Sequence, residues 1–211
     1  MKKAVPGFLR RVLRNALLRH RHSSRNRIGR KVVFSMDTQM GEGCVIGRNV
    51  IFGPGVKLGN RVTIGSRAVI ERMEVGDNSV VEGGVIITGH GEGRIKIGKE
   101  SFIGNNTVLD FSDNITIGDF VHVGYNQFWT HSSAMQAFNG IALADKDKRY
   151  RPTAPVVIEN NVYVGVHSTI YPGVTIRHNS IIAPNSAVTK DVESYTLAGG
   201  APARFIKSLK V

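Results

Sequence analysis

The chain has 211 residues, of which 41% are hydrophobic, so it can bury the core of one domain. Its single cysteine, Cys44, excludes an internal disulfide framework and a cysteine-cluster metal site, and no apolar run is long enough to span a membrane. The net charge is +12, but residues 1–36 carry 11 Lys and Arg and no acid, while the remaining residues are nearly neutral. Because the excess charge belongs to this segment alone, nucleic acid is not expected as a partner.

The first segment, residues 1–36, is predicted to be a basic helical arm. Its apolar residues recur at spacings of three and four, as in an amphipathic helix. They are Val5, Phe8, Leu9, Val12, Leu13, Ala16 and Leu17. Charged residues interrupt the apolar stretch, which excludes a secretory signal. Two interpretations stay open: the arm docks on this protein or on a neighbouring subunit, or residues 1–31 lie on an anionic membrane surface.

After residue 40 the pattern changes to an internal repeat of six residues. The clearest run of aliphatic residues is Ile158, Val164, Ile170, Ile176, Ile182 and Val188. The fifth residue of each unit is small or β-branched: Val162, Ser168, Val174, Ser180, Ser186 and Val192. Similar runs with small shifts of phase begin at Ile46, and Val and Ile together number 44 against 9 Leu, which favours strands over helices.

A period of six residues predicts a triangular solenoid. Each unit supplies one short strand and one turn, and three units close a coil of about 18 residues. The aliphatic and the small residue point inward, so the stacked coils share one continuous core. Glycine and asparagine in the turns tolerate a tight or left-handed backbone. The predicted class is therefore mainly β.

The repeat is interrupted once at length, by residues 130–155. A long insertion in a compact repeat is usually functional or disordered, and loops on a rigid scaffold often carry catalytic residues. His131 stands at the start of this insertion, whereas the other six histidines lie in the basic arm, in turns or at outward positions of the repeat. We therefore predict that His131 is catalytic, since a neutral imidazole can take a proton from an attacking hydroxyl.

The repeat resembles that of the hexapeptide-repeat acyltransferases over about residues 42–206. Within that family it is most similar to the galactoside and maltose acetyltransferases and to the xenobiotic acetyltransferases. The resemblance implies a left-handed parallel β-helix, assigned here to residues 37–198 with a catalytic loop at 130–155. A short tail at residues 199–211 follows, for which we expect a helix.

The acceptor region carries the first part of this resemblance. Residues 106–119 (NTVLDFSDNITIGD), followed by WTH at 129–131, are similar to the segment that binds the acceptor in galactoside and maltose acetyltransferases. The similarity implies that Asn106 holds the acceptor and that His131 is the general base.

The donor region carries the second part. NVYVG at 161–165, VTKD at 188–191 and LAGGAPARFIK at 197–207 are similar to the family's donor-binding segments. The resemblance implies that acetyl-CoA contacts Tyr163, Gly165, Thr189, Lys190, Gly199 and Arg204. No metal site is predicted, because the closely spaced His pair of the γ-class carbonic anhydrases, which share this solenoid, is missing.

The expected activity is an acetyl-CoA-dependent O-acetyltransferase that acts directly on the hydroxyl of a sugar or polysaccharide precursor. The family implies a homotrimer with sites between neighbouring solenoids, and a cytoplasmic location, with contact to the inner face of the membrane if the arm binds lipid. Two alternatives stay open. One is a sugar N-acetyltransferase. The other is a non-catalytic trimeric scaffold or binding module, favoured by Val166, where the family has a small residue, and by the shifted position of His131.

Overall fold

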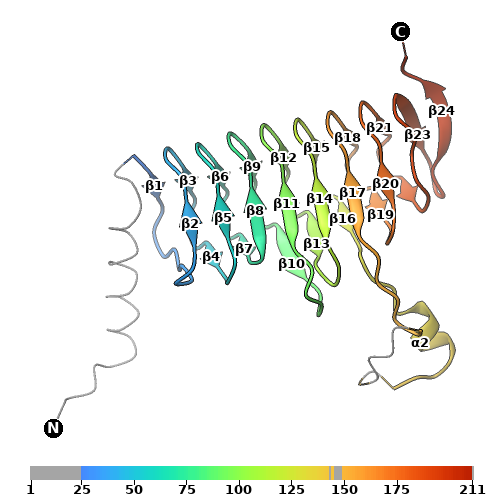
Figure 1. The fold of residues 1–211 in the computed structure, drawn as a ribbon, viewed down its shortest axis with the longest axis horizontal. Coiled ribbons are helices and arrows are strands. Elements are labelled where there is room, and N and C mark those ends of the chain that lie inside the picture. The colour runs from blue at the N-terminus through green and yellow to red at the C-terminus, as the bar shows by residue number, and fades with distance from the viewer. Residues whose placement is uncertain (1–24, 143, 145–148, 211) are drawn as a thin grey trace.

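The computed structural model describes residues 25–142, 144 and 149–210, and it forms a parallel β-solenoid (Figure 1). Short strands wind around three faces, and the mainly β class predicted from the repeat is confirmed. The helix expected in the N-terminal arm lies outside the described residues. No helix in the described part of the chain is long and apolar enough to cross a bilayer.

Each face of the solenoid is one sheet, and successive strands of the chain pass from sheet A to sheet B to sheet C. Sheet A contains β1 (Arg27–Ile28), β3 (Val45–Ile46), β6 (Thr63–Ile64), β9 (Val80–Val81), β12 (Phe102–Ile103), β15 (His122–Val123), β18 (Tyr163–Val164), β21 (Ile181–Ile182), β23 (Thr196–Gly199) and β24 (Arg204–Ser208). Sheet B contains β4 (Ile51–Phe52), β7 (Val69–Ile70), β10 (Ile86–Thr88), β13 (Val108–Asp110), β16 (Gln127–Phe128), β19 (Thr169–Ile170) and β22 (Ala187–Val188). Sheet C contains β2 (Gln39–Met40), β5 (Lys57–Leu58), β8 (Met73–Val75), β11 (Ile95–Ile97), β14 (Ile115–Ile117), β17 (Val156–Ile158) and β20 (Thr175–Ile176). We call the turns between these faces the A/B, B/C and C/A corners.

The core is built from the two inward positions of each six-residue unit. The six aliphatic residues of the run from Ile158 to Val188 are at most 1% exposed, and the small residues from Val162 to Val192 are at most 6% exposed. The intervening strand residues point outward, as alternation along a strand requires. The inward positions expected from the repeat are therefore confirmed for this run.

The turns take the backbone conformation that the asparagines predict. Asn49, Asn78, Asn106 and Asn179 all have φ between 55° and 58°. Other turn asparagines bind the coil next to them instead: the Asn160 side-chain oxygen accepts a hydrogen bond of 2.8 Å from the Asp119 backbone N–H. Both roles suit asparagine because its short polar side chain tolerates left-handed backbone and bonds locally.

The solenoid begins ten residues earlier than the predicted boundary at 37. Strand β1 pairs in parallel with β3, with Arg27 opposite Val45. The six-residue spacing does extend backward through Ile28, Phe34 and Met40, and Phe34 is 1% exposed. An aromatic residue and a methionine fill two of these inward positions, so a search for β-branched residues and leucine overlooks them.

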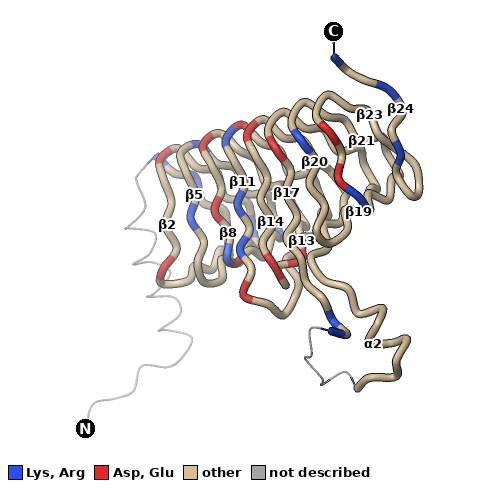
Figure 2. Tube along the Cα trace, turned by 45° about the vertical axis from the view of Figure 1, so that its right-hand side comes forward, with Lys and Arg blue, Asp and Glu red and all other residues tan. Residues whose placement is uncertain are grey.

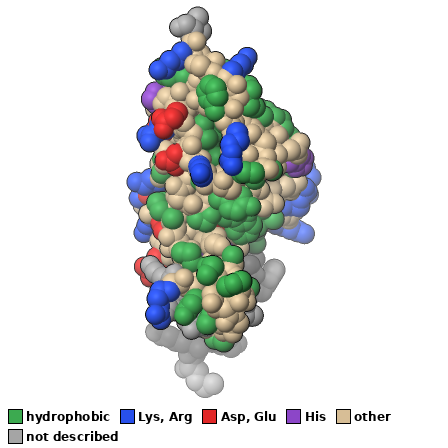
Figure 3. Space-filling model, turned by 90° about the vertical axis from the view of Figure 1, so that its right-hand side faces the viewer, with side chains coloured by type: hydrophobic (Ala, Val, Ile, Leu, Met, Phe, Trp, Pro, Cys, Tyr) green, Lys and Arg blue, Asp and Glu red, His purple; other side chains and the backbone are tan. Residues whose placement is uncertain are grey.

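The expected C-terminal helix is wrong. Residues 204–208 form β24, which turns back and pairs antiparallel with β23. The last strand of a parallel sheet leaves unpaired backbone N–H and C=O groups, and a returning strand satisfies them where a helix would not. This strand leaves Phe205 and Ile206 66% and 53% exposed. Figure 3 shows that hydrophobic side chains lie on the surface at this end of the molecule.

The long insertion leaves the solenoid after β16 and returns at β17. Its described part carries one short helix, α2 (Ala134–Phe138), and projects from the side of the solenoid (Figure 1). A two-residue bridge between His131 and Thr153 joins the outgoing and returning segments. The base of the insertion is therefore held by backbone pairing at the B/C corner.

Candidate functional site

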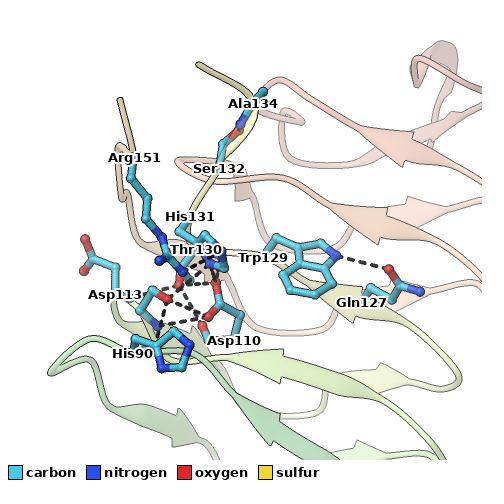
Figure 4. A network of polar contacts seen from close by, with 11 residues as sticks. His90, Asp110, Asp113, Gln127, Trp129, Thr130, His131, Ser132, Ala134 and Arg151 are labelled. Atoms are coloured by element: carbon cyan, nitrogen blue, oxygen red, sulfur yellow. Dashed lines mark hydrogen bonds and ion pairs between the residues drawn. The ribbon is translucent and has the colours of Figure 1, made fainter. Parts of the chain in front are cut away.

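The structure places a histidine–aspartate pair at the base of the insertion. Asp110 ends β13 and His131 follows β16, and these two strands are neighbours in sheet B. The His131 Nδ1 atom lies 2.6 Å from Asp110 Oδ2 (Figure 4). The Asp110 side chain is fully buried and that of His131 is 15% exposed. The pair therefore combines a rigid, desolvated carboxylate with an imidazole that solvent can still reach.

Asp110 receives several hydrogen bonds besides that from His131. The Thr130 backbone N–H donates to Oδ2 at 2.9 Å, and the Thr130 hydroxyl donates to the same oxygen at 3.0 Å. The Ser112 hydroxyl donates to Oδ1 at 2.8 Å. Burial raises the pKa of Asp110, but the hydrogen bonds from His131, Thr130 and Ser112 outweigh it, so this pKa lies below its ordinary value. Asp110 is thus ionised at neutral pH.

An ionised Asp110 fixes the tautomer of His131. A carboxylate only accepts hydrogen bonds, so Nδ1 carries the proton and Nε2 carries the free lone pair. The Arg151 guanidinium lies 3.3 Å from Nε2 through its Nη2 atom, which agrees with this assignment because guanidinium only donates. The Trp129 ring meets the imidazole edge-on at 6.0 Å between centroids. The free nitrogen of His131 therefore points to the side where Arg151 lies.

A groove of about 610 Å³ opens beside this pair. Its lining comes from a loop between β10 and β11, from the turn after Asp110 and from the returning segment of the insertion. The residues are His90, Gly91, Glu92, Gly93, Ser112, Asp113, Asn114, Arg151 and Thr153. Ser112 and Arg151 touch both the groove and His131. A ligand in this groove would therefore lie within reach of the imidazole.

The other predicted site residues divide between two corners. Asn106 and Gly165 lie in A/B turns, and Gly199 ends a sheet A strand at the same corner. Thr189 and Lys190 follow β22 at the B/C corner, as His131 follows β16. Sheet B separates the two groups, so a single chain does not bring Asn106 to His131.

The donor residues predicted on sheet A do lie together. Tyr163 on β18 is 47% exposed and pairs with Ile181, which pairs with Leu197 on β23. Gly165 has no room for a side chain, because a Cβ there would lie 2.5 Å from the Pro184 backbone nitrogen. Arg204 begins β24 opposite Gly199, and its guanidinium is exposed.

Sequence reasoning missed Asp110, Ser112 and Arg151. Position gives only a weak signal: Asp110 directly follows the repeat residue Leu109, where many units have glycine, but Glu71, Glu82 and Glu159 hold the same position in other units. Arg151 carries no comparable signal, because only the path of the insertion brings it back to His131. In the described ranges, no group of three His, Cys, Asp or Glu residues is placed to hold a metal ion.

Two family models match parts of the chain. Residues 28–133 match the family described as "GMPPB C-terminal domain", and residues 155–190 match "Bacterial transferase hexapeptide (six repeats)". The galactoside O-acetyltransferase of Escherichia coli (strain K12) is 33% identical over 135 residues, 64% of this chain and 63% of that protein. A probable macrolide acetyltransferase of Lysinibacillus sphaericus is 53% identical over 51 residues, 24% of this chain and 28% of that protein. The chain therefore spans less than two thirds of the length of these relatives.

Among solved structures, a mutant of AntD, an N-acyltransferase from Bacillus cereus in complex with dTDP and coenzyme A, shares the fold. It has a TM-score of 0.58 and 20% identity, and the match covers 92% of this chain and 89% of that one. At this identity the likeness describes the shape of the backbone.

Proposed function

The chain belongs to the hexapeptide-repeat transferase family and, through residues 28–133, to the family of the GMPPB C-terminal domain, and from this premise we propose an acetyl-CoA-dependent O-acetyltransferase. Its acceptor is the hydroxyl of a sugar or polysaccharide precursor. The observation that carries the proposal is the His131–Asp110 pair beside the groove, in which Asp110 holds the proton on Nδ1 and leaves the lone pair on Nε2, the atom that Arg151 contacts. The named acetyltransferases among its relatives support the donor and the type of reaction.

In the proposed reaction His131 is the general base. The acceptor hydroxyl gives its proton to Nε2 while its oxygen attacks the carbonyl carbon of the acetyl thioester. The carbon–sulfur bond then breaks, and the coenzyme A sulfur leaves with the proton that the imidazolium returns. Asp110 stabilises the imidazolium in between, because its carboxylate lies 2.6 Å from Nδ1. Transfer is direct, so no acyl-enzyme is formed.

The location of the predicted donor residues supports a site shared between copies. Sheet B separates Gly165 and Gly199 from His131, so a second chain must present its A/B corner to this B/C corner. Sheet B is suited to such packing because Ile51, Val69 and Ile86 are 42–52% exposed in one register row. We propose a homotrimer in which the sheet B faces point toward each other, with coenzyme A between neighbours.

Sheet C has a different surface. Lys57 and Glu74 form an ion pair of 3.0 Å across neighbouring strands, and Lys96 is exposed on the next strand. Figure 2 shows Lys, Arg, Asp and Glu side by side along the strands of this face. A charged face of this kind is suited to solvent rather than to an apolar interface. In the proposed trimer, sheet C is therefore the outer surface.

The reaction is tested by calorimetric titration with acetyl-CoA and coenzyme A. We expect saturable binding near one per chain that Tyr163→Ala or Arg204→Ala weakens and that Lys96→Gln does not change. Acetyl transfer is then measured on a panel of sugars and amino sugars, where His131→Ala should lower kcat by about 10²- to 10⁴-fold. Absence of binding at millimolar donor would leave a non-catalytic scaffold as the better account, and faster transfer to amines would favour N-acetylation.

The cytoplasmic location and the membrane contact of residues 1–31 are also proposals. Strand β1 begins at Arg27 inside the first coil, so a deletion that spares the solenoid removes only residues 1–24. We expect the full chain to bind vesicles that contain anionic lipid and the shortened chain to lose that binding while it still binds acetyl-CoA. Equal vesicle binding by both chains would refute the membrane interpretation.

A further inference from the structure

The Arg151 guanidinium contacts His131 Nε2, the atom that accepts the proton in the proposed reaction. Its Nη2 lies 3.3 Å from His131 Nε2, while Nδ1 of the same ring is bonded to Asp110. The imidazole therefore has one lone pair, and a guanidinium N–H points at it. As long as this contact persists, an acceptor hydroxyl cannot give its proton to Nε2.

Arg151 also has no acidic partner among the residues that the structure describes. Among residues 25–142, 144 and 149–210, no carboxylate lies within ion-pair distance of its guanidinium. Yet two carboxylates, Glu92 and Asp113, line the same groove as Arg151. Figure 4 shows Asp113 and Arg151 on the same side of His131, opposite Trp129. The groove thus offers the guanidinium a second place where it would be paired.

We propose that Arg151 is a gating residue that rests on His131 Nε2 and moves onto Glu92 and Asp113 when the acceptor enters. The inference builds on the proposed function, because it assigns the general base to His131. The incoming hydroxyl replaces the guanidinium N–H as the donor to Nε2. The displaced guanidinium gains charge compensation from the two carboxylates, which offsets the loss of its contact with the imidazole.

This exchange has a chemical consequence for selectivity. An acceptor gains access to the base only if it reaches Nε2 and also leaves Glu92 and Asp113 available to Arg151. A neutral hydroxyl satisfies both conditions. A protonated amine brings a second cation that competes with Arg151 for the same carboxylates. The gate therefore favours neutral, hydroxyl-bearing acceptors.

The gate is tested on the free protein by carbethoxylation of histidine with diethyl pyrocarbonate, measured peptide by peptide with mass spectrometry. The reagent attacks the free imidazole lone pair, so its rate at His131 reports how often Nε2 is uncovered. His122, which is exposed on sheet A, is the internal reference. We expect Arg151→Met, which keeps the bulk and removes the donor, to raise the His131 rate about tenfold or more. Lys96→Gln, which removes one positive charge on sheet C, should leave that rate unchanged.

A second variant tests the second place of the guanidinium. In the double variant Glu92→Gln with Asp113→Asn, the guanidinium has no carboxylate to move to, and the His131 rate should fall below that of the wild type. Equal rates of His131 carbethoxylation in the wild type and in Arg151→Met would overturn the gate. A rate in the double variant equal to that of the wild type would overturn the proposed move of the guanidinium onto Glu92 and Asp113. Neither measurement needs acetyl-CoA or an acceptor. Faster carbethoxylation of His131 in Arg151→Met, together with a lack of acetyl transfer, would therefore sustain the gate and refute the proposed reaction.

Discussion

The substitution Asp110→Asn tests the histidine–aspartate pair most directly. Asparagine keeps the size of the side chain and a carbonyl oxygen for the Thr130 backbone N–H, but it removes the charge that faces Nδ1 at 2.6 Å. A hydrogen bond to a charged group contributes about 1.5–3 kcal/mol. Since each 1.36 kcal/mol is a factor of ten in rate, kcat/KM should fall by about tenfold to about 150-fold. The loss should be smaller than that of His131→Ala, because the base itself remains.

The assay is the release of coenzyme A thiol at fixed acetyl-CoA with the best acceptor of the sugar panel. The KM for acetyl-CoA should not change, because Asp110 is fully buried and cannot reach the donor. Ser112→Ala is the matched comparison: it removes a neutral donor to the same carboxylate and should cost only about two- to tenfold. An Asp110→Asn enzyme with wild-type kcat/KM would refute the claim that a carboxylate is needed to support the imidazolium.

Three further predictions concern stability and are measured by urea or acid unfolding. Gly165→Ala should lower the free energy of unfolding by about 1–3 kcal/mol, because its Cβ would lie 2.5 Å from a Pro184 backbone atom. Gly124→Ala, where the nearest atom is 3.8 Å away, is the control and should change little. Phe128→Ala should cost about 3–5 kcal/mol, since Phe128 is fully buried in the coil that precedes the insertion. The pKa of Asp110 is lower in the folded protein than its ordinary value of 3.8, so ionised Asp110 stabilises the fold at pH values above 3.8. This contribution is lost as the pH falls from 3.8 toward the folded pKa. The wild type should therefore lose stability more steeply below pH 3.8 than Asp110→Asn does.

The repeat was readable from the sequence because one rule governs every coil. An inward position tolerates only a narrow range of volumes, so Ile170 or Val188 reports its burial through its identity and spacing. The first coil was hidden because Phe34 and Met40 fill the same positions with different chemistry. The C-terminal strand β24 could not be predicted for another reason. All of its residues are exposed, so it lacks the alternation of buried and exposed residues that is typical of a strand, and it forms because its backbone pairs with β23.

Only part of the candidate site could be predicted from the sequence, and the reason is geometric. His131 was identifiable because it marks the point where a regular pattern stops. Its partner Asp110 lies 21 residues earlier, and only the stacking of β13 under β16 brings the two side chains together. Arg151 reaches the imidazole from the far end of the insertion. Contacts of this kind depend on which strands stack on each other. A six-residue period predicts the stacking only when every shift of phase along the chain is known.

The stacking also explains why the insertion is placed where it is. In a solenoid each strand is held on both sides by its neighbours, so the strand ends at a corner are rigid while the turn between them can be replaced at little cost. Asp110 ends one such strand, and its bonds to the Thr130 backbone and hydroxyl hold the first residue of the insertion in place. His131 is therefore positioned by the scaffold, while Arg151 is positioned by the insertion that returns. In the proposed reaction the base therefore lies on the rigid scaffold and the gating residue on the insertion, so a change in the insertion could alter the acceptor preference without moving the histidine–aspartate pair.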